Sequence, residues 1–294
     1  MISYSRNKIL AALAVLLVVV ISGAGVYSNM PNWPVHILSD EHRMLGEKSA
    51  EQYIAQGLDA SPRTQHEYRF NNDYLNYGRT KWWRDGPRLK LDAEGFPMVK
   101  YGDEFQYNPV TLSQFSLAAY GKFLAGDSRE KFNAAIEKLL TLQDKEGAFR
   151  YDFSYRHYTS TVAYKPGWIS GMAQGQALSA FSRAYQLEKS ARIKDAGDRA
   201  LAFLNVPAEL GGPFTTLKDL DPSLDGYIFF QEYVTSPNVY TLNGYMFTLL
   251  GVYDWWQATD SLEAKRMFKN GMRTLAKILP YFDIGSFSAT IFPI

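Results

Sequence analysis

Apolar and small residues dominate three segments in the second half of the chain, and none of these segments has a charged stripe. They cover residues 112–120, 172–181 and 242–250. After a polar break, each is followed by a segment whose apolar residues recur at helical spacing with charged residues between them. This second set covers residues 132–140, 196–204 and 268–279. Because helices that are apolar all round are buried and one-sided helices face water, the pattern predicts three helical hairpins.

Repeated hairpins of this kind suit an inner ring of buried helices wrapped by an outer ring. The predicted fold class is mainly α, an (α/α) toroid or barrel of helical hairpins, with an ordinary antiparallel bundle as the alternative. Each hairpin ends in a Gly-x-Phe sequence, which begins at Gly147, Gly212 and Gly285. The third should introduce a further inner helix, but the sequence ends at Ile294. We therefore expect a ring that is incomplete at its C-terminal end. Either the sequence is a fragment, or another element covers the apolar faces that the missing hairpin would leave exposed.

The region before the hairpins has a different pattern. Prolines within residues 29–34 indicate a spacer, and residues 40–57 have helical periodicity. Residues 62–107 are rich in Tyr, Asn, Arg, Gly and Pro, which predicts short strands and loops. The expected parts are a signal segment, a spacer with a short helix and a β/loop-rich region, and the toroid domain, over residues 1–28, 29–107 and 108–294.

The N-terminal segment is typical of an export signal. Arg6 and Lys8 precede an uninterrupted apolar run from Ile9 to Ile21, which is the order of a signal sequence. The run is at the lower limit for a bilayer span, so an uncleaved signal anchor is slightly favoured over a removed signal peptide. A signal anchor and a signal peptide would both place the chain after this segment outside the cytoplasm. Since the chain has no cysteine and no Asn-x-Ser/Thr sequon, we favour a bacterial inner membrane or periplasm, with a Golgi lumen as the eukaryotic equivalent.

Composition excludes several classes of protein. With Lys+Arg 31 against Asp+Glu 30, the chain lacks the basic charge of a nucleic-acid-binding protein, so no nucleic-acid partner is expected. The absence of cysteine removes disulfides, thiol catalysis and cysteine-ligated zinc. The four histidines lack the spacing of a zinc motif, and no metal site is predicted.

Residues 227–237 form the most unusual stretch, a polar and aromatic loop that directly precedes the third inner segment. Within it, Glu232 and Tyr233 are adjacent, and a carboxylate beside a phenol is a plausible acid/base set once both pKa values are shifted toward neutrality. The alternative is a loop in which the tyrosine packs and the glutamate caps the following helix.

Several stretches resemble the C-terminal domain of the D-glucuronyl C5-epimerases, which convert glucuronate to iduronate within heparosan and heparan sulfate chains. The longest are Gly-Trp-Ile-Ser-Gly-Met-Ala-Gln-Gly-Gln-Ala-Leu-Ser from residue 167, Gln-Glu-Tyr-Val-Thr-Ser-Pro from residue 231 and Leu-Asn-Gly-Tyr-Met from residue 242. Residues 92–97 and 107–115 resemble the region that leads into the family's first helices. The resemblance runs in order over roughly residues 92–287.

The resemblance implies a reaction and a set of site residues. Inversion at C5 removes a proton next to a carboxylate and returns one to the opposite face, without an organic cofactor. Glu232 and Tyr233 match the family's active-site Glu-Tyr, and Asn243 matches a residue that contacts substrate. The further substrate-contacting segment corresponds to Arg156, His157, Tyr158 and Thr159. Arg156 suits a uronate carboxylate because a guanidinium binds it through two hydrogen bonds; a surface arginine is the equal alternative.

The C-terminal sequence departs from the family. Family members continue beyond their Asp-x-Gly-Ser motif into a tail with two more active-site tyrosines and an arginine. Here Asp283-Ile-Gly-Ser286 is present, Thr290 stands where the first of those tyrosines is expected, and the tail is absent. We therefore expect an incomplete acid/base set, which makes turnover by this chain uncertain.

The leading hypothesis is a uronate C5-epimerase that acts on an acidic polysaccharide, attaches to the membrane through its N-terminal segment and, by resemblance, forms a homodimer. One alternative is a non-catalytic polysaccharide-binding protein, and another is a polysaccharide lyase or hydrolase on the same scaffold. Residues 79–90 interleave cations with Trp82 and Trp83, which suits an acidic sugar chain. For residues 79–90 we slightly favour the alternative interpretation, a surface hairpin whose Arg and Lys side chains already have partners within the protein.

Overall fold

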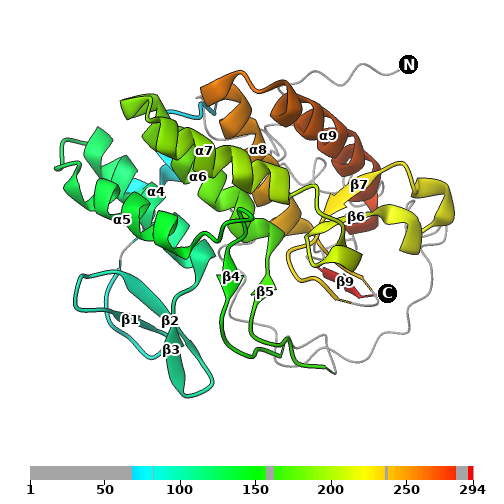
Figure 1. The fold of residues 1–294 in the computed structure, drawn as a ribbon, viewed down its shortest axis with the longest axis horizontal. Coiled ribbons are helices and arrows are strands. Elements are labelled where there is room, and N and C mark those ends of the chain that lie inside the picture. Colours follow the sequence, from blue (N-terminus) through cyan, green and yellow to red (C-terminus); the bar gives the residue numbers. More distant parts are fainter. Residues whose placement is uncertain (1–67, 82, 157–161, 236–237, 283–290, 294) are drawn as a thin grey trace, which may run out of the picture.

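The computed structural model describes residues 68–81, 83–156, 162–235, 238–282 and 291–293, and these residues are mainly helical (Figure 1). The long helices are α4 (Pro109–Leu124), α5 (Glu130–Leu142), α6 (Gly171–Glu188), α7 (Ala191–Phe203), α8 (Leu242–Thr259) and α9 (Leu262–Phe282). The short helical elements are α3 (Tyr77–Thr80), η1 (Tyr74–Asn76), η2 (Ala208–Leu210), η3 (Leu217–Asp219) and η4 (Pro222–Leu224). Each predicted hairpin segment coincides with one of the long helices, so the mainly α expectation is confirmed.

The inner helices α4, α6 and α8 are buried over most of their surface, and α6 packs between α4 and α8. The outer helices are one-sided, as the sequence predicts. In α5, for example, the buried positions are Phe132, Ala135, Ile136 and Leu139, which lie on one stripe of a helix. Helices α5, α7 and α9 each cover the inner helix that precedes them in the chain.

Helices α6 and α8 approach each other through glycine. A methyl group on Gly251 would collide with the backbone of Gly175, and one on Gly175 would collide with the backbone of Thr248. The two backbones therefore touch directly, which requires a residue without a side chain at both positions.

The strands are short antiparallel pairs. They comprise β1 (Leu89–Leu91), β2 (Pro97–Tyr101), β3 (Glu104–Gln106), β4 (Arg150–Tyr151), β5 (Trp168–Ile169), β6 (Phe214–Thr216), β7 (Ile228–Phe230), β8 (Val239–Thr241) and β9 (Ile291–Pro293). Strands β1–β3 form one sheet, and β4–β5, β6–β7 and β8–β9 form separate pairs. The sheet β1–β3 lies within the region for which short strands and loops are predicted, but the same region also contains the short helices η1 and α3, which the sequence pattern did not predict.

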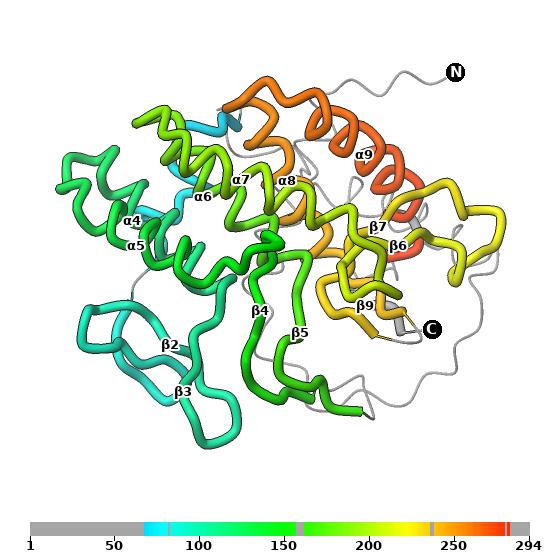
Figure 2. Tube along the Cα trace, viewed as in Figure 1, coloured from blue at the N-terminus to red at the C-terminus, as the bar shows by residue number. Residues whose placement is uncertain are grey.

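In Figure 1, strands β1–β5 lie below the helices, and β6, β7 and β9 lie to the right of them. In the chain, α4 follows β3, α6 follows β5 and α8 follows β8 within three residues or fewer. All three inner helices thus begin at the end where these strands lie. The tube in Figure 2 shows the β4–β5 hairpin extending from this end, away from the helices.

The opposite ends of α6 and α8 are joined by a buried ion pair. Arg183 lies 2.9 Å from Asp254, and both side chains are fully buried. The hydroxyl of Tyr68 donates to Asp254 at 2.9 Å, and Arg183 donates to the backbone carbonyl of Asn72 at 3.2 Å. The guanidinium also lies 5.1 Å from the ring centre of Tyr74. Residues from the start of the described chain are thereby fixed to the inner helices.

Several sequence predictions fall outside the described residues, among them the export signal, the helix over residues 40–57 and the position of Thr290. Among the residues that the structure describes, no helix combines the length and the apolar character needed to cross a bilayer. Membrane attachment through the N-terminal segment stays a prediction.

Candidate active site

Glu232 lies in the loop after β7, at the end of the molecule where the inner helices begin. The loop is fixed by backbone hydrogen bonds on both sides of Gln231, whose carbonyl accepts from Gly171 at 2.8 Å and whose amide donates to Pro213 at 2.8 Å. Since Gly171 is the first residue of α6, the position of Glu232 is set by the helical frame.

The carboxyl of Glu232 is buried and only partly satisfied. Burial raises its pKa from 4.5 to about 7, against a hydrogen bond from Tyr233 that lowers it. The second carboxyl oxygen, Oε2, has no hydrogen-bond partner among the described residues. An unpaired buried polar group costs about 1–3 kcal/mol, and such groups are retained where they serve a ligand or a reaction.

Glycine 244 makes room for this carboxyl. A methyl group at Gly244 would collide with both the Cβ and Oε2 of Glu232. Gly244 is the third residue of α8, directly after Asn243, so the Leu-Asn-Gly sequence noted above lies against the candidate acid/base residue. Asn243 itself is half-buried.

The β4–β5 hairpin brings tyrosines to Glu232. The negative charge of Glu232 contributes, after burial, to raised pKa values of Tyr151, Tyr155 and Tyr164. The charge of Glu232 is the largest cause of the raised pKa of Tyr233, followed by burial. Four phenols therefore lie within electrostatic reach of one carboxyl, and their raised pKa values keep all of them protonated near neutral pH.

Trp168 holds the hairpin tyrosines together. Its ring centre lies 3.7 Å from that of Tyr151, 5.5 Å from that of Tyr155 and 5.4 Å from that of Tyr164, and all three pairs are stacked. Backbone hydrogen bonds of 3.3 and 2.6 Å join Tyr155 and Tyr164 directly. The aromatic stack and the backbone pairing fix where these hydroxyl groups lie.

The N-terminus of α4 closes another side of the cluster. Asn108 caps α4 through its side chain and donates to the Tyr101 hydroxyl at 2.5 Å. The Tyr151 hydroxyl donates to Asn108 at 3.3 Å and accepts from the backbone of Val110. Burial raises the pKa of Tyr101 to about 12.

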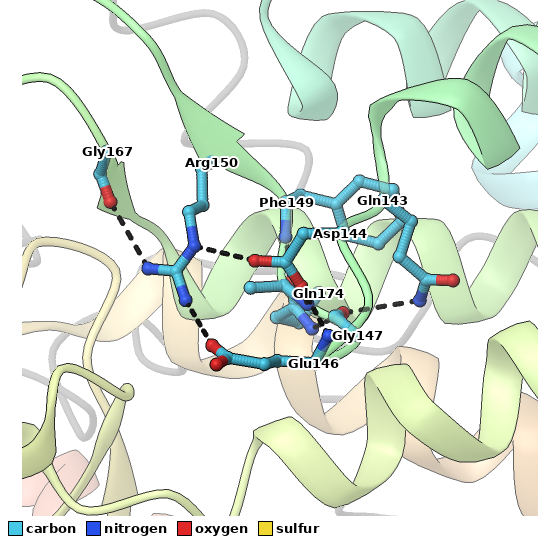
Figure 3. A network of polar contacts seen from close by, with 9 residues as sticks. Gln143, Asp144, Glu146, Gly147, Phe149, Arg150, Gly167 and Gln174 are labelled. Atoms are coloured by element: carbon cyan, nitrogen blue, oxygen red, sulfur yellow. Dashed lines mark hydrogen bonds and ion pairs between the residues drawn. The ribbon is translucent and has the colours of Figure 1, made fainter.

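A polar network holds the base of the hairpin on α6 (Figure 3). Arg150 binds Asp144 at 2.6 Å and Glu146 at 2.7 Å. The Gln174 side chain accepts from the amide of Phe149 and donates to the carbonyl of Gly147, both at 2.9 Å. Because these contacts fix both faces of the turn, the tyrosines project from a rigid base.

The helix N-termini shape the electrostatics of this end. Helices α4, α6 and α8 all begin here, and the exposed amides of a helix N-terminus favour negative charge. The site thus combines a carboxyl whose pKa is raised to about 7 with a field that stabilises negative charge. Among the described residues, no group of three or more His, Cys, Asp or Glu side chains is arranged to hold a metal ion.

The predicted site residues have different outcomes. Glu232, Tyr233 and Asn243 lie at one end of the inner helices, as described above. Arg156 is exposed, one residue beyond Tyr155, and its role stays a prediction. His157, Tyr158 and Thr159 lie outside the described residues.

Sequence reasoning missed the hairpin tyrosines and Tyr101. A signal was present, because Phe149, Tyr151, Phe153 and Tyr155 alternate with polar residues, as on one face of a strand. The stretch at residues 79–90 has a packing role at one of its tryptophans: Trp83 lies edge-on to Phe115 at 5.5 Å between ring centres and packs against the core. Trp82 lies outside the described residues.

Comparison with known proteins identifies similar chains. The model of the family described as D-glucuronyl C5-epimerase C-terminus matches residues 143–291. The D-glucuronyl C5-epimerase of Caenorhabditis elegans is 27% identical over 167 residues, which cover 53% of this chain and 26% of that protein. An uncharacterized protein of Methanocaldococcus jannaschii is 27% identical over 163 residues, which cover 52% of this chain and 51% of that protein. The match therefore spans about a quarter of the length of the first relative and about half of the length of the second.

Proposed function

Because the chain belongs to the D-glucuronyl C5-epimerase C-terminal family, we propose that it is an epimerase that inverts C5 of D-glucuronate residues in an acidic polysaccharide and yields L-iduronate. The substrate proposed is heparosan, an unsulfated polysaccharide that contains glucuronate. The observation that carries it is Glu232, a buried carboxyl with a pKa raised to about 7 and one oxygen without a partner among the described residues.

Glu232 is proposed as the base that removes the C5 proton. A base works best when its pKa lies near the operating pH, because it is then both available and strong. At neutral pH about half of the Glu232 carboxyls are ionised, since the pKa is about 7. Tyr233 donates to the carboxylate and holds it in orientation, while the unpartnered Oε2 is the atom that takes the proton.

Removal of the C5 proton places negative charge on the substrate carboxylate, and this charge needs stabilisation. The amides at the N-termini of α4, α6 and α8 supply a favourable field at this end. Asn243, in the first turn of α8, is proposed to orient the uronate by hydrogen bonding. Each of these steps uses groups of the chain itself, so the proposed reaction proceeds without an organic cofactor.

We further propose that the three helical hairpins belong to an (α/α) toroid. The shared direction of α4, α6 and α8, with each outer helix against its inner partner, is the arrangement that such a ring repeats. In that frame the candidate site lies at one end of the inner ring.

The test is exchange at C5 in deuterium oxide. The full chain is incubated with heparosan and the C5 position is followed by NMR. Deuterium at C5 together with iduronate signals is expected, and Glu232→Gln should reduce both by about 10²–10⁴-fold, the usual contribution of a general base. Glu209→Gln, at an exposed glutamate, is the matched control and should keep wild-type rates.

Two results would contradict the proposal and identify the alternatives. Binding of heparosan by the folded wild-type chain without any exchange would indicate a non-catalytic binding protein. An unsaturated uronate product, detected by its ultraviolet absorbance, would indicate a lyase, because β-elimination begins with the same proton abstraction.

A further inference from the structure

Two of the outer helices differ in how their charges are arranged. On α7, each cation lies beside a carboxylate of the same helix or of α5. The pairs are Arg192–Glu137, Lys194–Asp198 and Arg199–Asp195. Helix α9 instead carries five cations and a single acidic residue, although the whole chain has nearly equal numbers of both. The cations of α9 are Lys265, Arg266, Lys269, Arg273 and Lys277, and its acidic residue is Glu263.

Three of these cations form an exposed row, which we call the basic row. Lys269, Arg273 and Lys277 follow one another at intervals of four residues, so they lie on one face of the helix. All three are exposed, and none has an ion pair with a carboxylate in the part of the chain that the structure describes. By contrast, Arg266 binds Glu263 at 2.7 Å.

The basic row does not help the helix to fold. Like charges four residues apart repel each other on a helix surface and destabilise it. The opposite face of α9, which includes Met267, Leu275 and Ile278, is buried and packs on α8 without these cations. Solubility is equally served by a surface that mixes both signs of charge, as on α7. A negatively charged ligand would remove the repulsion and so account for the row.

The basic row leads toward the candidate active site. Helix α9 returns along α8, which begins at the end where Glu232 lies, so the Lys277 end of the row is the nearer one. The hydroxyl of Tyr245 lies 2.8 Å from the carbonyl oxygen of Ile228 and 3.1 Å from that of Gly271. The middle of α9 is thus fixed beside β7, the strand that precedes the Glu232 loop (Figure 1).

We propose that the basic row of α9 is a second binding site for the acidic polysaccharide and holds a part of the chain outside the candidate active site. This inference rests on the proposed function, since its ligand is the proposed substrate. The row is straight and spans about 12 Å, because eight residues of helix separate its ends. Such a line of cations is complementary to a linear polymer with carboxylates at regular intervals.

A membrane surface fits the row less well. Helices that lie on a bilayer insert apolar and aromatic side chains beside their cations. The apolar face of α9 is already packed on α8. Among the positions of α9 whose exposure the structure describes, Leu262 is the only large apolar residue that is exposed.

The expected contribution is to the affinity for long chains. A polymer bound at the row keeps its remaining sugars close to the active site, which raises their effective concentration there. A short oligosaccharide occupies the active site alone and gains nothing from the row. The row should therefore change the KM for the polymer and leave kcat unchanged.

The test measures binding of heparosan polymer and of a heparosan tetrasaccharide to the full chain by titration calorimetry at low salt. The triple variant Lys269→Gln, Arg273→Gln, Lys277→Gln should bind the polymer about tenfold more weakly, since three exposed charge contacts of modest strength are lost. Its affinity for the tetrasaccharide should stay within about twofold of the wild type. Raising sodium chloride from about 0.05 to about 0.5 M should bring variant and wild type together, because salt screens exposed charges.

A matched control removes the same charge from three separate segments. Arg69, Lys100 and Lys145 are exposed and have no ion pair among the described residues. The variant Arg69→Gln, Lys100→Gln, Lys145→Gln should bind the polymer within about twofold of the wild type. Thermal unfolding of the basic-row variant should be no lower than that of the wild type, since the substitutions remove a repulsion within α9.

Three results would overturn the inference. The first is polymer binding by the basic-row variant within about twofold of the wild type, and the second is an equal loss in the two triple variants. The third is weaker binding of the basic-row variant to vesicles of phosphatidylcholine with about one quarter phosphatidylserine, with unchanged binding of heparosan, which would assign the row to a membrane surface.

Failure of the proposed function gives a different result. A wild-type chain that exchanges no deuterium at C5, but whose polymer binding depends on the basic row, would overturn the epimerase and support the second binding site.

Discussion

The inner helices carry a buried carboxyl near each end, and the two have opposite surroundings. At the C-terminal ends of α6 and α8, Asp254 accepts hydrogen bonds from Arg183 and Tyr68 at 2.9 Å each. At the N-terminal ends, Glu232 has a hydrogen bond from Tyr233 and an oxygen without a partner among the described residues. Burial raises the pKa of both carboxyls, but Arg183 counteracts this effect only at Asp254.

This difference separates a carboxyl with a structural role from one that is a candidate for catalysis. A buried charge with a guanidinium partner and further hydrogen bonds joins elements of the fold. A buried carboxyl without a cation keeps a proton affinity near neutral pH, which is useful for catalysis and unfavourable for stability. The same helices thus carry an ion pair that joins elements of the fold near one end and a candidate acid/base group at the other.

The largest expected effect comes from removing the cation. Arg183→Met should lower the free energy of unfolding by about 3–5 kcal/mol, because it leaves Asp254 buried without its charge partner. Urea denaturation with an unchanged slope measures the loss. The double variant Arg183→Met, Asp254→Leu should recover most of it, since a buried ion pair and an apolar pair of similar volume are nearly equivalent. A loss below about 1 kcal/mol in the single variant would remove the contrast between the two carboxyls.

The next effect is the pH dependence of stability. Glu232 has a pKa raised from 4.5 to about 7, so the folded state binds the proton more tightly than the unfolded state. Its contribution is fully present below about pH 4.5 and is lost as the pH rises through 7, a total of about 3 kcal/mol at most. Glu232→Gln should therefore match the wild type near pH 5 and be more stable near pH 8.5.

Denaturation curves of both proteins across this range isolate the contribution of Glu232, because Asp254 and the other titrating groups are common to both. A stability difference that does not change with pH would show that Glu232 titrates as an ordinary exposed carboxyl.

The smallest effect comes from crowding the carboxyl. Gly244→Ala should cost about 1–3 kcal/mol, because the added methyl group collides with Glu232. The rate of epimerisation by the folded variant should also fall, and by more than the loss of folded protein explains, since the displaced carboxyl is the proposed base. Gly226→Ala is the matched control, because a methyl group there meets nothing within 4 Å, and its stability should stay within about 0.5 kcal/mol of the wild type. Equal behaviour of the two variants would contradict the packing of Gly244 on Glu232.

The helical frame could be predicted because its signals are local. Each of the six long helices contains a segment whose apolar spacing is visible within about three turns of sequence, and the distinction between buried and one-sided helices follows from the same spacing. Glu232 and Tyr233 could be named as candidates from the sequence, because they are adjacent in an unusual loop and match a family motif.

The remaining features depend on pairings that local patterns do not specify. Tyr151 pairs with Trp168 between strands β4 and β5. The alternation of aromatic and polar residues that begins at Phe149 does not specify which strand is the partner or which residues the aromatic face contacts. Arg183 and Asp254 are separated by 71 residues, and Tyr68 and Asp254 by 186. Such long-range contacts follow from the packing of the helices rather than from any one segment.

The contact between Gly175 and Gly251 has a consequence for the proposed substrate site. Two backbones that already touch cannot move closer, so this contact sets a minimum distance between α6 and α8. For the proposed epimerase, the distance between Gly171 and Leu242, where these helices begin, would then be the same for every substrate. Adjustment to sugar chains of different bulk would fall to the β4–β5 hairpin and the loops.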